Sequence, residues 1–429
     1  MSPITPSKKG TPSVDTNREA RRDTSSYVLI LAAMTAATFL VALAVALHTR
    51  QTTGIIDSDA WGRLGIHIAE GRGLADNHGR PTAFRGPVLP LIFALAAVVF
   101  GKSLEILQVV LCVFFALGNG IIGFIAYRFF KSIRVMMLTM LIYMAYNPAY
   151  VWFCHIFTEP VFTALLAMFI LTWVTTIRRG SSFGYLATGL LLALNALLRP
   201  EMYGFLPVVL ADVAWSHGRK GMKAIGLVVL GFLLLEVPWV ARNYVSVGKP
   251  VVTAANGTQS LFQATWYQAQ NWQGNVYHDP ARFPVEPKAF WRLPEAERDE
   301  MFKHWALENI REAPFSVFMC VPKRLLMFFY QLGPTGWMPS WKSLVFGTIL
   351  YVFAVIGYWQ SSSDQRQLLN RCLSVIAILA LIHALLVSEF RYSHPIQPYV
   401  FMMACVAFVW VFDALVSAFL SKARPAPGG

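Results

Sequence analysis

Two aspartates, Asp57 and Asp59, begin the first polar stretch after a long apolar run, and Arg85 lies further along the same stretch. A carboxylate at a membrane boundary can take a proton from a hydroxyl group, since partial desolvation raises its pKa towards a useful range. An arginine keeps its charge and offers a fork of donors that matches phosphate oxygens. These residue types suit a transfer in which Asp57 is the base and an arginine holds a departing phosphate.

Each acid also has a structural interpretation. Asp57 precedes Ser, Asp, Ala and a helical apolar rhythm, so its side chain could cap the first free amides of a helix. Asp59 would then lie in the first turn, where a carboxylate stabilises the helix dipole. Glu159 stands before Pro160, which is also typical of a helix start.

The composition places these residues in a polytopic membrane protein. Hydrophobic residues make up 56% of the chain, charged residues make up 14%, and the mean hydropathy is +0.50, with repeated long apolar runs. The net charge of +13 does not indicate a nucleic-acid partner, because Lys and Arg gather in short loops, as the positive-inside rule requires. The five cysteines have no paired spacing and indicate neither disulfides nor a zinc site.

Ten membrane spans are predicted from the apolar runs and from the basic clusters that should lie in the cytoplasm. The first apolar run is long for a signal peptide and is interpreted as an uncleaved signal anchor. Both termini are then cytoplasmic. The spans cover residues 27–47, 104–127, 135–151, 160–177, 183–198, 202–216, 224–241, 343–359, 372–388 and 396–420.

Two further apolar pieces, 87–100 and 314–332, are predicted to be interfacial or re-entrant helices on the outer side. The first is short and bounded by proline, and the second carries Lys323 and Arg324 at its middle. The expected fold is all-α, with an amphipathic outer helix over 294–314. The chain divides into a disordered cytoplasmic tail (1–26), one integral membrane domain (27–421) with outer loops 48–103 and 242–342, and a second cytoplasmic tail (422–429).

This topology brings charged residues from distant spans to one face of the membrane. Charges at span ends are costly unless they pair or bind a ligand, so their clustering is the main functional signal in the sequence. The residues that join Asp57 on this face are Glu159, Arg199, Glu201, Arg242, Glu389 and Arg391.

Several short motifs follow one another in an order similar to that of a known family. They are Asp57-x-Asp59-x-Trp61, Ala69-Glu70-Gly71-Arg72-Gly73, Phe84-Arg85-Gly86-Pro87 with Pro90, Asn147-Pro148, Thr158-Glu159-Pro160, Leu198-Arg199-Pro200, Pro238-Trp239-x-x-Arg242-Asn243-Tyr244 with Gly248, Asn256-Gly257 and Glu389-Phe390-Arg391-Tyr392-x-x-Pro395. Over residues 27–420 the chain resembles the GT-C superfamily of membrane glycosyltransferases. The resemblance is strongest to the bacterial glycosyltransferase family 39 type, which is related to protein O-mannosyltransferases and the aminoarabinose transferase of lipid A.

The resemblance implies a GT-C-like fold and an inverting transferase that takes a sugar from a polyprenyl-phosphate-linked donor. It implies that the sugar is held at the outer face of a bacterial plasma membrane, where an acceptor hydroxyl attacks C1 and the first-loop acid is the base. The chain departs from the family pattern in two places: Ser58 separates the two acids, and Trp61 replaces the usual tyrosine. Which of Asp57 and Asp59 is the base is therefore open, and we predict Asp57.

The remaining candidates are predicted to bind the substrate. Arg85 and Arg391 are the expected ligands of the donor phosphate, with pairing to nearby acids or lipid head groups as the alternative. His155 and Glu159 stand four residues apart, but such a pair without a third ligand is usually structural, so no metal or other cofactor is expected. Arg242 has the alternative of anchoring the end of its span. The other substrate-binding residues are Asp59, Glu159, Arg199, Arg242, Glu389 and Tyr392.

The expected partners are the lipid-linked sugar donor, membrane lipids and an acceptor that the sequence does not specify, which could be a lipid, a glycan or a protein. The outer loop after Arg242 is rich in Gln, Asn, Trp and Tyr, which suits sugar rings or an interfacial belt. A transporter or lipid flippase is the alternative function and would keep ionisable residues near mid-membrane depth. A non-catalytic membrane subunit is a third possibility, and its first-loop acids would face no cavity.

Overall fold

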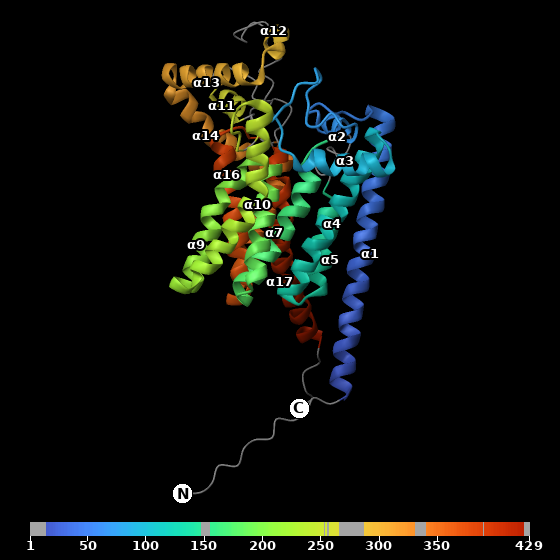
Figure 1. The fold of residues 1–429 in the computed structure, drawn as a ribbon. Helices are drawn as coiled ribbons and strands as arrows, with labels where there is room; N and C mark the ends of the chain where they lie inside the picture. Colours follow the sequence, from blue (N-terminus) through green and yellow to red (C-terminus); the bar gives the residue numbers. More distant parts are fainter. Residues whose placement is uncertain are drawn as a thin grey trace, which may run out of the picture.

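The computed structural model describes residues 14–146, 155–252, 254, 257–265, 287–330, 340–388 and 390–423. Across these ranges the regular elements are helices, joined by two isolated β-bridges. Figure 1 shows most of the long helices running side by side, with several shorter helices gathered at one end of the bundle. The chain is an all-α, polytopic membrane protein, as predicted.

Each of the ten predicted spans is matched by a helix that covers all or part of its described residues. Seven helices are long and apolar enough to cross a membrane, counted over the described part of the chain. The other three, α5, α8 and α9, have 12, 17 and 13 residues. The ten helices are α1 (Val14–Thr53), α4 (Leu104–Phe130), α5 (Ile133–Met144), α7 (Glu159–Arg179), α8 (Ser182–Leu198), α9 (Phe205–His217), α10 (Met222–Val247), α15 (Trp341–Gln360), α16 (Ser363–Leu385) and α17 (Gln397–Ala423).

The N-terminal segment differs from the prediction. Helix α1 begins at Val14, so residues 14–26 of the expected disordered tail are helical, while residues 1–13 lie outside the described chain. The physical reason lies in the sequence after Val14, where good helix formers such as Glu19, Ala20 and Arg21 precede the apolar run without Gly or Pro. Extending an existing helix costs far less than starting one.

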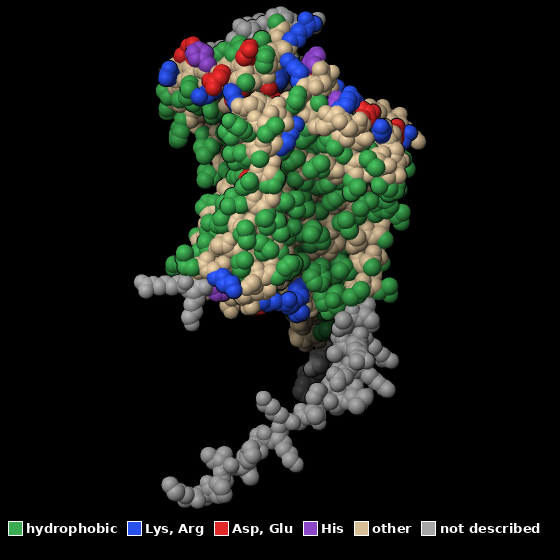
Figure 2. All heavy atoms as spheres, in the orientation of Figure 1, with side chains coloured by type: hydrophobic (Ala, Val, Ile, Leu, Met, Phe, Trp, Pro, Cys, Tyr) green, Lys and Arg blue, Asp and Glu red, His purple; other side chains and the backbone are tan. Residues whose placement is uncertain are grey.

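Solvent-exposed ion pairs link helices at one end of the bundle. Arg134 at the start of α5 pairs with Asp413 of α17 at 2.5 Å, and Arg178 at the end of α7 pairs with Asp364 at the start of α16 at 3.0 Å. Figure 2 shows charged side chains at the two ends of this face of the molecule and a broad apolar band between them. This distribution is the one that a bilayer imposes, because charges are excluded from its hydrocarbon core.

The two additional apolar pieces form short helices near the opposite end of the bundle. Helix α3 (Val88–Phe100) lies across the end of the bundle beside α2 (Trp61–Ala69), and α14 (Pro314–Phe329) leads from α13 (Glu295–Glu312) towards the bundle. Neither α3 nor α14 meets the length and hydropathy expected of a membrane span. Arg324 of α14 is buried and donates to the carbonyls of Ala384 and Leu385 at 3.3 Å, which fixes α14 to the end of α16.

The segment between α10 and α14 has a small hydrophobic core in its described part. It is formed by Phe262 of α11 (Gly257–Thr265), Phe290 of α12 (Pro287–Arg292), and Phe302, Trp305 and Ala306 of α13. The aromatic rings contact one another with centroids 5.0 to 6.0 Å apart. The amphipathic helix predicted over 294–314 is confirmed as α13. This unit forms part of the wall of the cavity described below.

Candidate active site

A cavity of about 980 Å³ opens at the end of the bundle where the first loop, the start of α7 and the end of α8 meet. Its wall holds six arginines and four carboxylates, an excess of two positive charges. A concave site with this balance favours an anionic ligand. The charged wall residues are Arg63, Arg80, Arg85, Arg199, Arg298, Arg391, Asp59, Asp76, Glu159 and Glu201.

Asp57, the predicted base, caps helix α2 in this structure. Its Oδ1 accepts from the amide of Gly62 at 3.1 Å, and its Oδ2 accepts from the amide of Arg63 at 2.9 Å. The side chain is 6% exposed and is not part of the cavity wall, whereas Ser58, Asp59 and Ala60 are. Burial raises the pKa of Asp57, although the two amide hydrogen bonds oppose the rise. The geometry thus supports the capping interpretation, and the catalytic role of Asp57 stays a prediction.

Asp59 faces the cavity and meets Arg85. The Nη2 of Arg85 lies 3.1 Å from the Oδ1 of Asp59, and its Nε donates to the Asp59 carbonyl at 3.3 Å. The guanidinium is also packed over the rings of Trp61 and Phe84, at 5.2 Å and 4.9 Å from their centroids. Asp59, with 29% of its side chain exposed, can be reached by a ligand. Of the two first-loop aspartates, Asp59 therefore has the better position for a base.

The turn between the two aspartates and α2 carries backbone strain. Ala60 adopts a left-handed conformation with φ of 62°, and its amide donates to the Asp57 carbonyl at 3.2 Å. A residue with a Cβ pays about 1 kcal/mol for that conformation. Strain of this kind persists where the surroundings fix it, often beside functional groups. Here the turn directs Asp57 to the helix and Asp59 to the cavity.

Gly86 lets the first loop approach α8 closely. A Cβ at this position would lie 1.8 Å from the carbonyl oxygen of Leu197, which is far inside van der Waals contact. Only glycine fits here, since backbone meets backbone. The approach places Arg85, next to Gly86, and Arg199, just beyond the end of α8, in the wall of the same cavity.

Glu159 and Arg199 form a buried pair. Arg199 donates from Nη2 to the Oε1 of Glu159 at 2.7 Å and from Nε to the Oγ1 of Thr158 at 2.9 Å, and its Nη1 lies 3.5 Å from Glu201. The side chains of Glu159 and Arg199 are 1% and 8% exposed. Glu159 is also the first residue of α7, followed by Pro160, so the helix-start interpretation holds as well. Both residues reach the cavity wall.

Arg391 and Tyr392 come from the 3₁₀ helix η4 (Phe390–Ile396). The guanidinium of Arg391 packs over Phe157 at 4.4 Å, and the ring of Tyr392 stacks on that of His383 at 4.5 Å. Both residues line the cavity, while Glu389, predicted with them, lies outside the described residues. Burial and the charge of Arg391 lower the pKa of His155, and Asp59 opposes this, so Arg391 and Asp59 act on the same ring.

Arg242 holds the first loop instead of lining the cavity. It donates from Nη1 to the carbonyl of Thr82 at 2.7 Å and from Nη2 to that of Leu74 at 2.9 Å. Two carbonyls of the first loop are thereby fixed to the C-terminal part of α10. The anchoring alternative describes these contacts, and the contribution of Arg242 to the site is to position the loop.

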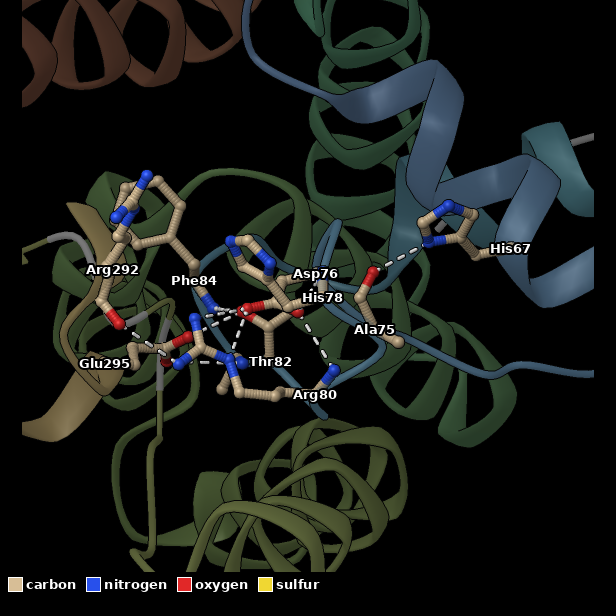
Figure 3. A network of polar contacts seen from close by, with 10 residues as sticks. His67, Ala75, Asp76, His78, Arg80, Thr82, Phe84, Arg292 and Glu295 are labelled. Atoms are coloured by element: carbon tan, nitrogen blue, oxygen red, sulfur yellow. Dashed lines mark hydrogen bonds and ion pairs between the residues drawn. The ribbon is translucent and has the colours of Figure 1, made fainter. Parts of the chain in front are cut away.

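A second polar network ties the first loop to α13, as Figure 3 shows. The Oδ1 of Asp76 accepts from the amides of His78 and Arg80, at 2.8 and 2.9 Å. The Nε of Arg80 donates to the Oδ2 of Asp76 at 2.9 Å. Although burial raises the pKa of Asp76, these hydrogen bonds and the charge of Arg80 lower it overall. Thr82 then donates to Glu295, the first residue of α13, at 2.5 Å.

Several wall residues have no role in the sequence analysis. Asp76 and Arg80 frame a tight turn with Gly79 at φ of 74°, and the run Asp-Asn-His-Gly is a turn signal that could have located it. Gln259 and Gln263 lie in the polar and aromatic stretch after Arg242, whose composition suits sugar rings. Further wall residues without an assigned role include Arg298, His383 and Glu201. No group of three metal-binding side chains occurs among the described residues.

The chain is similar to known proteins in structure. No protein-family model matches the chain, and no curated protein matches it. The chain is similar to the solved structure of ArnT from Cupriavidus metallidurans bound to undecaprenyl phosphate, with 12% sequence identity and a TM-score of 0.42. The similarity covers 94% of this chain and 81% of that one.

Proposed function

We propose that the protein is an inverting glycosyltransferase that moves a hexosyl or pentosyl group from a polyprenyl-phosphate-linked donor to an acceptor hydroxyl at the outer face of the membrane. The observation that carries this proposal is the pair Asp59 and Arg85, 3.1 Å apart, on the wall of a net-basic cavity at one end of an apolar bundle. A carboxylate that can act as a base and a guanidinium that can bind phosphate thus reach the same cavity, and a donor phosphate that takes Arg85 from Asp59 frees this carboxylate for the opposite face of the sugar. The motif resemblance to GT-C enzymes agrees with this chemistry.

The size and position of the cavity suit a lipid-linked donor. Ligand sites typically measure about 300–1,000 Å³, so a cavity of about 980 Å³ has room for a sugar phosphate and the reacting part of an acceptor. Because the cavity lies at the end of the bundle, the polyprenyl tail would remain in the apolar layer while its phosphate enters the basic cavity. Arg85 and Arg391 are the ligands we assign to that phosphate.

The reaction needs one proton acceptor and one stabilised leaving group. Asp59 takes the proton of the acceptor hydroxyl as its oxygen attacks C1 of the sugar from the face opposite the phosphate. The bond between C1 and the phosphate oxygen breaks, its electron pair stays on the lipid phosphate, and the configuration at C1 inverts. The arginines stabilise the added negative charge, and Asp59 later releases its proton to water.

The Glu159–Arg199 pair is assigned to the sugar. Both side chains are largely buried at the wall, and their carboxylate and guanidinium can accept from and donate to sugar hydroxyls. Tyr392, whose ring lies under the guanidinium of Arg199 at 5.4 Å, adds an aromatic surface to this part of the wall. Such surfaces suit the apolar face of a pyranose ring.

The outer-face assignment rests on the charge distribution along the bundle. The end opposite the cavity carries Arg134, Arg128 in the last turn of α4, and Arg178 and Arg179 in the last turn of α7. Basic loops lie in the cytoplasm by the positive-inside rule. The cavity would then open on the extracytoplasmic side of a bacterial plasma membrane.

The decisive experiment incubates the purified protein with a panel of polyprenyl-phospho-sugars together with lipid, glycan and protein acceptors, and measures release of the free lipid phosphate. The wild type is expected to turn over one or more donors. Asp59→Asn is expected to lower turnover by about 10²–10⁴-fold, the range for loss of a general base. Asp364→Asn, which alters an exposed pair at the opposite end, is the matched control and keeps wild-type turnover. Wild-type turnover by Asp59→Asn would refute the assigned base, and no release from any donor would refute the transferase.

A further inference from the structure

A row of charges continues from Arg199 into α16 and ends at His383. The Oε1 of Glu201 lies 3.5 Å from the Nη1 of Arg199 and also 3.5 Å from the Nε2 of His383. None of the three side chains is more than 14% exposed, and all three reach the cavity wall. The proposed reaction gives Glu201 and His383 no role, although burying such groups is costly.

The hydrogen bonds of His383 determine which ring nitrogen carries a proton. Its Nδ1 lies 2.9 Å from the carbonyl oxygen of Val387, which can only accept, so Nδ1 must be the donor. In a neutral imidazole the lone pair of Nε2 would then face the carboxylate of Glu201, which is repulsive. A proton on Nε2 converts the same contact into an ion pair.

Glu201 is ionised over the whole physiological range. Burial raises its pKa, but the contact with His383 and the charge of Arg199 outweigh burial and lower the pKa to about 2. His383 therefore faces a permanent negative charge. Its ring is also held in place, because it stacks on Phe328 at 5.5 Å and on Tyr392 at 4.5 Å.

The charge of this part of the wall depends on His383. With His383 neutral, Arg199, Glu159 and Glu201 sum to one negative charge, and with His383 protonated the sum is zero. The other charged groups that face the region are Arg391 on η4 and Arg324 on α14, and both stay positive near neutral pH. A single proton on His383 thus changes how strongly the wall attracts an anion.

We propose that His383 is a positioning residue that works in its protonated form, sharing Glu201 with Arg199 so that the cavity wall attracts the phosphate of the lipid donor. The inference rests on the proposed function, since it concerns the same phosphate. His383 contacts Glu201 and Tyr392 and acts through them. Its consequence is that donor binding weakens as the pH rises and His383 loses its proton.

The test is direct binding of undecaprenyl methyl phosphate, a phosphodiester whose single negative charge does not change near neutral pH. Its dissociation constant is measured on the purified full-length protein in nanodiscs, from about pH 5.5 to about pH 8.5, which spans the usual titration of histidine. The wild type is expected to lose about tenfold in affinity, the order expected when one nearby charge is lost in a partly screened site. His383→Gln, an uncharged amide that can still donate to Glu201, is expected to bind at the weak level throughout.

Two further variants sharpen the test. The control is His217→Gln, which is expected to keep the wild-type pH profile. His217 lies 2.6 Å from the hydroxyl of Tyr185, near the start of α8 and therefore at the end of that helix away from Arg199. Glu201→Gln removes the carboxylate that favours the proton on His383, so the midpoint of the profile moves to lower pH. Thermal unfolding of each variant confirms that it is folded.

The outcomes separate the inference from the proposed function. A flat wild-type profile, a His383→Gln profile like that of the wild type, or an unchanged midpoint in Glu201→Gln overturns the role of His383 while leaving the transferase intact. If the wild type does not bind the probe at any pH, the proposed function itself fails. A pH-dependent wild type with a flat, weakly binding His383→Gln variant supports the inference.

Discussion

The two ends of the bundle carry ion pairs of different kinds. At the end with the basic loops, Arg134 and Asp413 pair with 56% and 49% of their side chains exposed. At the cavity end, Arg199 and Glu159 pair with 8% and 1% exposed. Exposed pairs contribute little to stability because water screens them, whereas buried pairs must recover a large desolvation cost. An excess of buried charge in a cavity indicates a ligand-binding role, and the exposed pairs indicate only topology.

The largest effect expected from this contrast is on stability. Arg199→Leu leaves Glu159 and Glu201 buried without their shared cation, and we expect a loss of about 3–5 kcal/mol. Thermal unfolding in detergent measures it. Arg134→Leu, the matched change at the other end, should leave the Tm unchanged, because its partner Asp413 stays in water. Equal effects of the two substitutions would remove the distinction between the ends.

A second prediction concerns the contact that joins the first loop to α8. Gly86→Ala places a Cβ against the Leu197 carbonyl, so the loop must shift and carry Arg85 with it. A displacement of ~1 Å at a reacting centre costs roughly 10²-fold in rate. Turnover of the lipid-linked donor measures the loss. Gly226→Ala is the control, since a Cβ at that position meets no atom within 4 Å and turnover should not change.

The smallest effect distinguishes the two first-loop aspartates. Asp57→Asn replaces one of the two oxygens that accept from α2 amides with an NH2 group, so it loses one hydrogen bond and should cost about 1 kcal/mol. Turnover should fall far less than in Asp59→Asn. Turnover by Asp57→Asn as low as that of Asp59→Asn would restore Asp57 as the base.

The difference in stability between the wild type and Asp57→Asn should also depend on pH in a defined direction. Because burial raises the pKa of Asp57 above its unfolded value, the carboxyl contributes stability that is complete below the unfolded pKa. That stability is lost as the pH rises through the folded pKa. The Tm advantage of the wild type over Asp57→Asn should therefore be greater near pH 3.5 than at neutral pH. An advantage that grows with pH would contradict the burial argument.

The sequence predicts the architecture well because long apolar runs and basic loops answer directly to the bilayer. The same topology predicts that charged residues from distant spans gather at one end of the bundle. The cavity wall there includes Arg85, Glu159, Arg199, Arg391 and Tyr392. The division of labour between Asp57 and Asp59 does not follow from sequence. The capping aspartate and the proposed base precede the same apolar rhythm, and the left-handed Ala60 turn is what directs them apart.

Other parts of the site depend on contacts between residues far apart in the chain. His383 has no nearby partner in sequence, and its position opposite Glu201 arises from the packing of α16 against η1 (Pro200–Gly204). Arg242, like Arg199, is a charged residue at the end of a predicted span. Its side chain donates to carbonyls of the first loop and does not line the cavity. Sequence identified the charged cluster, while the partner of each charge required the folded chain.

The separate aromatic core of α11, α12 and α13 has a consequence for how such a protein can change. Those rings pack mainly against one another, so this wall does not depend on the exact composition of the bundle beneath it. Residues that project from it into the cavity, such as Gln259 and Arg298, can therefore be exchanged while the membrane helices stay as they are. Under the proposed function, substitutions in this unit alone would change which acceptors the cavity takes.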